Sequence, residues 1–402
     1  MVRVKPKPGW YPTCQQELLL LATLSDGDIA LRSWQQWNMS SGGSQIDRGS
    51  IRLLPLLYHN LLVHGVTGPD IERLKEEYVR TWCDNELLFH QTAVLLGSLQ
   101  AQGIETIVLK GAALASLFYR DSGLRPMTDI DILVRPDSAQ AAMKVLRETG
   151  WRTVHQKPEA LIPYEQAVEF RDSRGNRCDL HWKIFWDGRQ VSDEEFWECA
   201  ISLEINEVLS RALNPTDQLL HVCVHGAVWN EMPTVRWIAD AAIILRTAQS
   251  EINWQRLIEQ AKKRRLMLPI GDTLEYLQSF LQLSIPPDVL KAIRNIAPSH
   301  LERTLYQIRV GPNSRLKRFP VLCYWLNAWR VDESPFHRKV SGYFRYLRSL
   351  WDVKSLRHLP LHITWKGLRG IVQIIVGFYS NESRVPSNQP HANPRERVNE
   401  MR

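Results

Sequence analysis

The stretch IVLKGAALASLFYRDSGLRPMTDIDILV, residues 107–134, decides the fold of this chain of 402 residues. Residues 105–109 predict a short buried strand, because an aliphatic run bounded by a glycine turn is typical of one. A helix over residues 111–119 follows, and the polar loop 120–128 leads into a second strand over 129–134. We expect the rest of the chain to be built around this strand–helix–strand unit.

The second strand alternates acidic and aliphatic residues. Side chains two residues apart on a strand share a face, so Asp129 and Asp131 point the same way, roughly 6–7 Å apart along the backbone. Ile130 and Ile132 then face the core. Two neighbouring carboxylates repel each other and raise each other's pKa. A fold that keeps both usually supplies a cation, and oxygen ligands suit Mg²⁺ or Mn²⁺.

The turn at Gly111 and Ala112 opens the predicted helix. Backbone N–H groups and the positive end of the helix dipole meet at such a turn, and both favour phosphate. Metal-binding acids close to a phosphate site are typical of metal-assisted nucleotidyl transfer.

Three pieces of the sequence carry a resemblance to a known group of proteins. LKG (109–111), Arg125 and DIDILV (129–134) resemble the DNA polymerase β-type nucleotidyltransferase superfamily, in which a glycine turn precedes a D-x-D strand and a third Asp lies on a later strand. RCDLHWKIF (177–185) supplies that acid as Asp179. DQLLHVCVHGA (217–227) and VRWIADAAIIL (235–245) narrow the resemblance to the uncharacterised nucleotidyltransferase family, over roughly residues 50–280.

The resemblance implies roles for the site residues. Asp129, Asp131 and Asp179 would be the catalytic acids and metal ligands, with Asp179 either accepting the proton of the attacking hydroxyl or completing a metal site. The expected nucleotide-binding residues are Lys110, Gly111, Ala112, Arg125 and His181, although His181 could instead orient the acid Asp179. Many superfamily members have Gly-Ser or Gly-Gly where this chain has Gly-Ala, which removes a hydroxyl but leaves the backbone donors.

Structural alternatives exist for several of these residues. Lys110 could pair with an Asp instead of a phosphate, Arg125 could bridge to Asp121 or Asp129, and Asp179 could pair with Arg177.

Three further residues are candidates for lining the cleft. His221 and His225 are spaced i, i+4 on one helix face, a spacing that could bind a transition metal, but no third ligand has a matching spacing. They are expected to line the cleft or to lie satisfied in the core. Asp240 is expected to line the cleft or to cap a helix.

The predicted fold class is α+β, with a mixed-sheet nucleotidyltransferase core between N-terminal helices and an all-helical C-terminal half. Further strands are expected at residues 151–155, 164–170 and 177–185, with a hairpin turn at 171–177. Helices are expected at 216–230, 235–248, 253–264 and 267–281. The expected regions are an N-terminal helical layer (1–103), the α/β core (104–213), a helical domain completing the cleft (214–300), a basic Trp-rich helical region (301–379) and a disordered tail (380–402).

Composition favours a globular protein, with 44% hydrophobic and 23% charged residues. Six scattered cysteines without a CxxC pair favour reduced thiols over a disulfide framework. Neither a signal peptide nor an apolar run near the roughly 18–20 residues of a membrane span is present. We therefore expect a cytoplasmic protein without a transmembrane segment.

Charge is unevenly distributed along the chain. From residue 301 onward there are 18 Lys and Arg against 7 Asp and Glu, whereas the net charge of the whole chain is +7. The C-terminal quarter is thus basic and the remainder mildly acidic. Basic residues interleaved with tryptophans can bind RNA or an anionic membrane surface, although a helical bundle with a solvated charged face has the same pattern.

Two functions follow as hypotheses. The first is an enzyme that moves NMP from an NTP, such as ATP, to an acceptor hydroxyl on a protein, an RNA or a small molecule, with Mg²⁺ or Mn²⁺ as cofactor and pyrophosphate as product. The second is a non-catalytic nucleotide-binding or scaffold protein that docks a partner, RNA or membrane through its basic C-terminal region.

Overall fold

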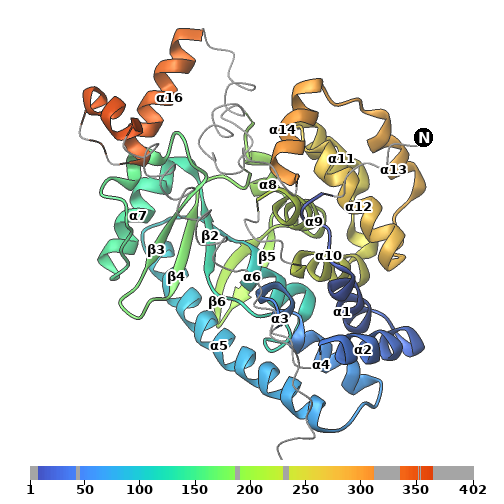
Figure 1. The fold of residues 1–402 in the computed structure, drawn as a ribbon. Helices are drawn as coiled ribbons and strands as arrows, with labels where there is room; N and C mark the ends of the chain where they lie inside the picture. Colours follow the sequence, from blue (N-terminus) through green and yellow to red (C-terminus); the bar gives the residue numbers. More distant parts are fainter. Residues whose placement is uncertain are drawn as a thin grey trace, which may run out of the picture. The chain divides into compact units, whose positions relative to one another are not determined.

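The computed structural model describes residues 8–41, 46–185, 191–229, 235–311, 336–351, 353 and 355–364, and Figure 1 shows its fold. The chain forms two compact units, Met1–Tyr343 and Phe344–Arg402. The helix α16 (Phe336–Leu350) crosses their boundary, and the short 3-10 helix η7 (Leu356–His358) belongs to the second unit. The sheet and the site described below all belong to the first unit.

The first unit contains a mixed six-stranded sheet with the order β3-β4-β2-β1-β6-β5. Strand β1 pairs antiparallel with β2 and parallel with β6, and β2 pairs parallel with β4. The hairpins β3–β4 and β5–β6 form the two edges. The strands are β1 (Thr106–Val108), β2 (Ile130–Val134), β3 (Ala167–Arg171), β4 (Arg177–His181), β5 (Ile201–Ile205) and β6 (Val208–Ala212).

Alternate residues of the central strands enter two different cores. Ile107 and Leu133 belong to the core that contains the N-terminal and C-terminal helices, whereas Val108 and Ile132 belong to the core that contains α7 and the second half of α5. This is the period of two expected for a strand covered on both faces. The side chains of the odd-numbered residues of β2, Asp131 and Leu133, therefore face the helical half.

Within residues 8–41 and 46–105, five helices precede the sheet: α1 (Cys14–Leu24), α2 (Gly27–Ser41), α3 (Arg48–Ile51), α4 (Leu54–Val63) and α5 (Pro69–Gln100). Thr13 and Gln16 form a capping box at the start of α1. Trp10 packs edge-on against Trp237, with ring centroids 5.3 Å apart, so the N-terminal segment packs on the C-terminal helices. Only the second half of α5 contributes to the core on the other face of the sheet.

Between and after the strands lie the remaining helices. The α-helices are α6 (Lys110–Leu114), α7 (Ala139–Glu148), α8 (Glu194–Glu198), α9 (Pro215–Val224), α10 (Arg236–Thr247), α11 (Trp254–Lys263), α12 (Met267–Leu281), α13 (Pro287–Asn295) and α14 (His300–Val310). The π-helices η1 (Ala115–Tyr119) and η4 (His225–Trp229) extend α6 and α9, and the 3-10 helices are η2 (Pro136–Ser138), η3 (Pro158–Leu161) and η5 (Gln249–Glu251).

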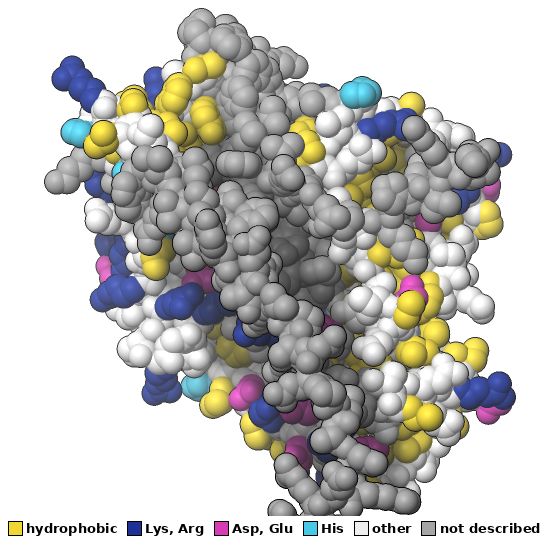
Figure 2. All heavy atoms as spheres, viewed as in Figure 1, with side chains coloured by type: hydrophobic (Ala, Val, Ile, Leu, Met, Phe, Trp, Pro, Cys, Tyr) yellow, Lys and Arg dark blue, Asp and Glu magenta, His cyan; other side chains and the backbone are white. Residues whose placement is uncertain are grey.

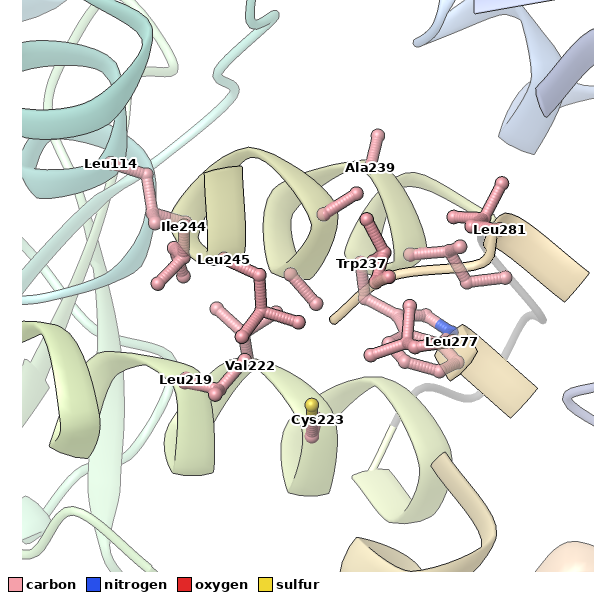
Figure 3. Packing of buried hydrophobic residues seen from close by; sticks show 14 of the residues in the cluster. Leu114, Leu219, Val222, Cys223, Trp237, Ala239, Ile244, Leu245, Leu277 and Leu281 are labelled. Carbon is pink, nitrogen blue, oxygen red and sulfur yellow. The ribbon is translucent and has the colours of Figure 1, made fainter. Parts of the chain in front are cut away.

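Figure 3 shows how α9, α10 and α12 share one core. Leu219 and Val222 of α9 lie beneath Leu245 of α10. Leu114, from the helix that follows β1, reaches Ile244 of α10 in the same core. The turn after β1 is thereby packed against the helical half.

The α+β class predicted from the sequence is confirmed, with a mixed sheet followed by helices. The helix expected over 111–119 consists of α6 and η1, and the expected hairpin turn at 171–177 joins β3 to β4. The five expected regions stay a prediction. The tail 380–402 lies outside the described residues, as does much of 301–379.

Two details of the sheet differ from the prediction. The strand expected at 151–155 was wrong: only Arg152 forms a bridge, to Arg171. The hairpin β5–β6 was not predicted at all, because its turn residues Asn206 and Glu207 adopt φ of 45° and 67° without a glycine to signal the turn.

Packing at Gly226 makes a testable prediction about the helical half. A Cβ on Gly226 would lie 2.1 Å from Cγ of Trp237, whereas a Cβ on Gly97 in α5 would meet no atom within 4 Å. Gly226→Ala should lower the free energy of unfolding by about 1–3 kcal/mol through overpacking. Gly97→Ala should raise it by about 0.5–1 kcal/mol. Urea unfolding followed by tryptophan fluorescence measures both, and equal midpoints for the two variants would contradict this packing.

Candidate active site

Asp131 lies at the centre of the candidate site on β2. The residue is only 2% exposed, and Oδ1 of its carboxylate accepts a hydrogen bond of 2.6 Å from Nζ of Lys110. Nε2 of His181 lies 3.0 Å from the same oxygen. A buried carboxylate is costly unless it is paired and hydrogen-bonded, and these two contacts satisfy that requirement.

The turn after β1 places Lys110 on this carboxylate. The backbone N–H of Leu109 donates to the carbonyl of Asp131 at 2.9 Å, which continues the antiparallel pairing of β1 with β2 up to the turn. Lys110 then adopts φ of 46°, the left-handed region that few residues other than glycine occupy. The chain turns sharply there, and α6 begins.

Asp179 and His181 come from the neighbouring parallel strand β4. The register pairs Asp131 directly with Asp179. Cys178 and Leu180 enter the core on the α7 face, so Asp179 and His181 lie on the face of Asp131. One ligand atom each from Asp131, Asp179 and His181 can be chosen so that all three lie within 4.8 Å of one another.

The pKa values of the two carboxylates are shifted in opposite directions. Burial alone would raise the pKa of Asp131, but the charge of Lys110 and the hydrogen bond from His181 hold it well below its ordinary value. Burial raises the pKa of Asp179, and the negative charge of Asp131 raises it further. The pKa of Lys110 is raised: burial would lower it, but the charge of and hydrogen bond to Asp131 outweigh that effect. The pair thus combines a firmly ionised acid with a more basic one.

This group of residues fits a divalent cation. Carboxylate oxygens suit Mg²⁺ and Mn²⁺, and imidazole is a common ligand of transition metals. The ammonium group of Lys110 neutralises Asp131 in this structure, so a cation on Oδ1 would compete with it. Asp131 and Asp179 belong to the predicted metal set, whereas His181 was predicted to contact the nucleotide or to orient Asp179.

Asp129 stands apart from this group. It is half-buried just before β2, and its Oδ2 lies 3.7 Å from Nη2 of Arg177. Arg177 also lies 2.9 Å from Glu169, through Nε, so the alternative pairing foreseen for Asp179 is made by Asp129 instead. The roles of Asp129 as catalytic acid and metal ligand stay predictions.

Gly111 lies where the turn passes closest to the loop before β2. A Cβ at this position would lie 3.1 Å from Sδ of Met127 and 3.4 Å from Nη1 of Arg125, so a larger residue there would press on these two side chains. Ala112 is buried behind the turn. The phosphate contacts expected of Lys110, Gly111 and Ala112 stay predictions.

Arg125 forms a buried bidentate ion pair with Asp240 of α10. Its Nε and Nη2 donate to the two carboxylate oxygens at 2.8 and 2.9 Å, and the hydroxyl of Tyr119 donates to Asp240 at 2.8 Å. Burial would raise the pKa of Asp240, but the charge of Arg125 lowers it. The partner is therefore Asp240 rather than Asp121 or Asp129. Nη1 of Arg125 remains beside the Gly111 turn, and its phosphate contact stays a prediction.

His221 is buried and His225 is half-buried on the helical side of the site. Burial, reinforced by the charge of Lys110, lowers the pKa of His221 to about 3 and that of His225 well below its ordinary value. Both are therefore neutral at pH 7. Their rings are 5.8 Å apart, and the ring of His221 lies 5.7 Å from Phe185. Their cleft-lining role stays a prediction.

Several residues that shape the site were missed in the sequence. Asn85 of α5 is fully buried and holds the loop before β2 through the carbonyl of Arg125 and the N–H of Met127. Arg236 donates through Nη1 to the carbonyl of Pro126 at 2.7 Å. Both lie far in sequence from their partners, and no local pattern distinguishes them. A polar residue at a core position of a helix was the one available signal for Asn85.

A comparison with models of protein families gives a match over more than half of the chain. A model of the family described as uncharacterised nucleotidyltransferase matches residues 50–282. Among solved structures, the chain is similar to an antigenic nucleotidyltransferase-like protein from Paracoccidioides brasiliensis, with 16% identity and a TM-score of 0.34 over 54% of this chain and 95% of that one. The search among curated proteins found no match.

Because the pKa values of Asp131 and Asp179 are shifted in opposite directions, replacing each acid with a neutral residue should have opposite effects on the stability of the fold. In a chelator at pH 7, Asp179→Asn should raise the melting temperature, because it removes a charge that is buried beside a like charge. Asp131→Asn should cost about 3–5 kcal/mol, because it leaves the ammonium group of Lys110 without its partner. Thermal unfolding measures both.

The difference in stability between Asp179→Asn and the wild type should depend on pH. Since the pKa of Asp179 is raised on folding, its ionised form is destabilising above that pKa and the penalty disappears as the pH falls through it. The advantage of Asp179→Asn over the wild type should therefore shrink on acidification. A variant less stable than the wild type at pH 7 would contradict the assigned direction.

Proposed function

The chain belongs to the family of uncharacterised nucleotidyltransferases, and on that premise we propose that it transfers NMP from an NTP to an acceptor hydroxyl. The observation that carries the proposal is the pairing of Asp131 with Asp179 on adjacent parallel strands, on the face that the helical half covers. A divalent cation would be held by these two carboxylates, with His181 beside them. When bound, the cation would stabilise negative charge on the phosphate and on the oxygens that attack and leave.

The residues of the site have distinct tasks in this reaction. The acceptor hydroxyl forms a bond to the α-phosphorus, the bond from that phosphorus to the bridging oxygen breaks, and pyrophosphate leaves. Asp179 would accept the proton of the hydroxyl, because Lys110 and His181 make their hydrogen bonds to Asp131 and leave the carboxylate of Asp179 to act as the base. Asp131 stays ionised throughout and holds the cation.

Lys110 and the backbone N–H groups of the Gly111 turn would bind the phosphate groups of the nucleotide. Lys110, which donates to Asp131 in this structure, would contact a phosphate oxygen if a bound cation took its place on that carboxylate. Asp129 would contribute a further oxygen ligand from the strand entrance, after exchanging its contact with Arg177 for the cation. Mg²⁺ and Mn²⁺ are the proposed ions because both prefer carboxylate ligands.

The acceptor class is left open by this site. A protein side chain, an RNA end and a small molecule all offer a hydroxyl, and ATP is one of the NTPs that could serve. On the face shown in Figure 2, basic and acidic side chains of the described residues are interspersed. No helix in the described part of the chain is long and apolar enough to cross a membrane.

The enzyme hypothesis predicts a labelled product that depends on both acids. Purified protein is incubated with each α-³²P-labelled NTP, Mg²⁺ or Mn²⁺ and a cell lysate, and proteins, RNA and small molecules are then separated. Label should appear in one fraction, and Asp179→Asn should reduce it by about 100-fold or more through loss of the base. Asp131→Asn should abolish it.

The matched control is Glu148→Gln, an exposed acid on α7 that pairs only with Lys144 among the described residues, and it should retain full labelling. Labelling that is unchanged in Asp131→Asn would refute the assignment. Nucleotide binding without any label would favour the scaffold role.

A further inference from the structure

Four arginines from separate parts of the chain gather on the Asp129 side of the site. Arg52 follows α3, Arg125 precedes β2, Arg177 begins β4 and Arg236 begins α10. We call these four residues the arginine cluster. Arg125 is buried, whereas Arg52, Arg177 and Arg236 are half-buried and so keep some contact with solvent.

Much of the hydrogen-bonding capacity of this cluster is unused. Arg125 donates to Asp240 through Nε and Nη2, and Arg236 donates to the carbonyl of Pro126 through Nη1. Each guanidinium offers five N–H donors, so donors remain on both. Arg177 lies 2.9 Å from Glu169 through Nε, whereas its Nη2 lies 3.7 Å from Asp129, longer than a hydrogen bond.

Arg52 is the most telling member. Its guanidinium makes no hydrogen bond or ion pair with any other residue that the structure describes. Burial lowers the pKa of Arg52; the charge of Asp129 raises it, and the charges of Arg125 and Arg177 lower it further. Half-burying an arginine among other arginines without a partner is unfavourable, which indicates that a ligand supplies the partner.

The charges of this region do not balance. The four guanidinium groups of the cluster face three carboxylates, Asp129, Asp240 and Glu169, and Glu169 also pairs with Arg171 outside the cluster. Burial, together with the positive charge of Arg125, lowers the pKa of Arg236 to about 9. An anion with several charges would relieve this repulsion, and the planar arginine fork matches phosphate oxygens.

We propose that Arg52, Arg177 and Arg236 form an anion subsite beside Asp129 that binds the phosphate groups of the nucleotide. Its position supports this assignment, because Nη1 of Arg125 connects the cluster to the Gly111 turn and Arg177 connects it to Asp129. The inference rests on the proposed function for the identity of the ligand, and it adds residues from the N-terminal helices and α10 to the nucleotide site.

Arg52→Met tests the subsite without requiring turnover. Inorganic triphosphate is titrated into the protein by calorimetry in EDTA, so that arginines and not a metal ion report the binding. Because a hydrogen bond to a charged group contributes about 1.5–3 kcal/mol, Arg52→Met should weaken triphosphate binding by roughly 10–100-fold. Its melting temperature should be unchanged or higher, since the substitution removes a repelled charge.

Three controls separate the possible outcomes. Arg73→Met removes an exposed arginine of α5 and should leave triphosphate affinity unchanged. Asp179→Asn should lose nucleotide transfer yet keep triphosphate binding, so failure of the proposed function is distinguishable from failure of the subsite. The third titrates a 5′-phosphorylated oligonucleotide: if Arg52→Met weakens this ligand but not triphosphate, the cluster binds an acceptor and the proposal is overturned. Equal triphosphate affinity in Arg52→Met and wild type would also overturn it.

Discussion

The buried carboxylate of Asp131 is the constraint on which this structure depends. It lies in the middle of the sheet at 2% exposure, where an unpaired charge would destabilise the fold. Its two partners come from different elements, Lys110 from the turn after β1 and His181 from the end of β4. Three adjacent strands must therefore keep their register for the site to exist.

A second ion pair joins the sheet to the helical half. Arg125 and Asp240 are separated by more than a hundred residues, yet they form a buried bidentate pair. Leu114 packs against Ile244 on the same helix (Figure 3). Because a buried pair is costly to break, α10 holds the loop before β2 and the turn after β1 in a fixed relation. The helix α10 is thus part of the architecture of the candidate site.

How much could be predicted from the sequence depended on the range of each interaction. The D-x-D strand, the glycine turn and the Asp179–His181 strand have local patterns of period two or turn chemistry, and these were located to within a few residues. Their convergence on one face follows from the same period. The pairing of Lys110 with Asp131 was foreseen as one of two alternatives.

Interactions between distant segments could not be predicted. Nothing near Asp240 indicates that Arg125 is its partner, and Asn85 lies in a long helix whose polar residues are mostly exposed. The hairpin β5–β6 lacked a glycine in its turn, although β6 pairs with β1 in the sheet. Each of these depends on tertiary packing, which overrides local propensity.

The most direct test of this account is a crystal structure with Mn²⁺ and a non-hydrolysable NTP analogue, with the ion located by its anomalous signal. We expect an ion between the carboxylates of Asp131 and Asp179, with Nζ of Lys110 displaced from Asp131 toward a phosphate. An ion found elsewhere, with Lys110 still bound to Asp131, would contradict the central claim that these two acids form the catalytic metal site.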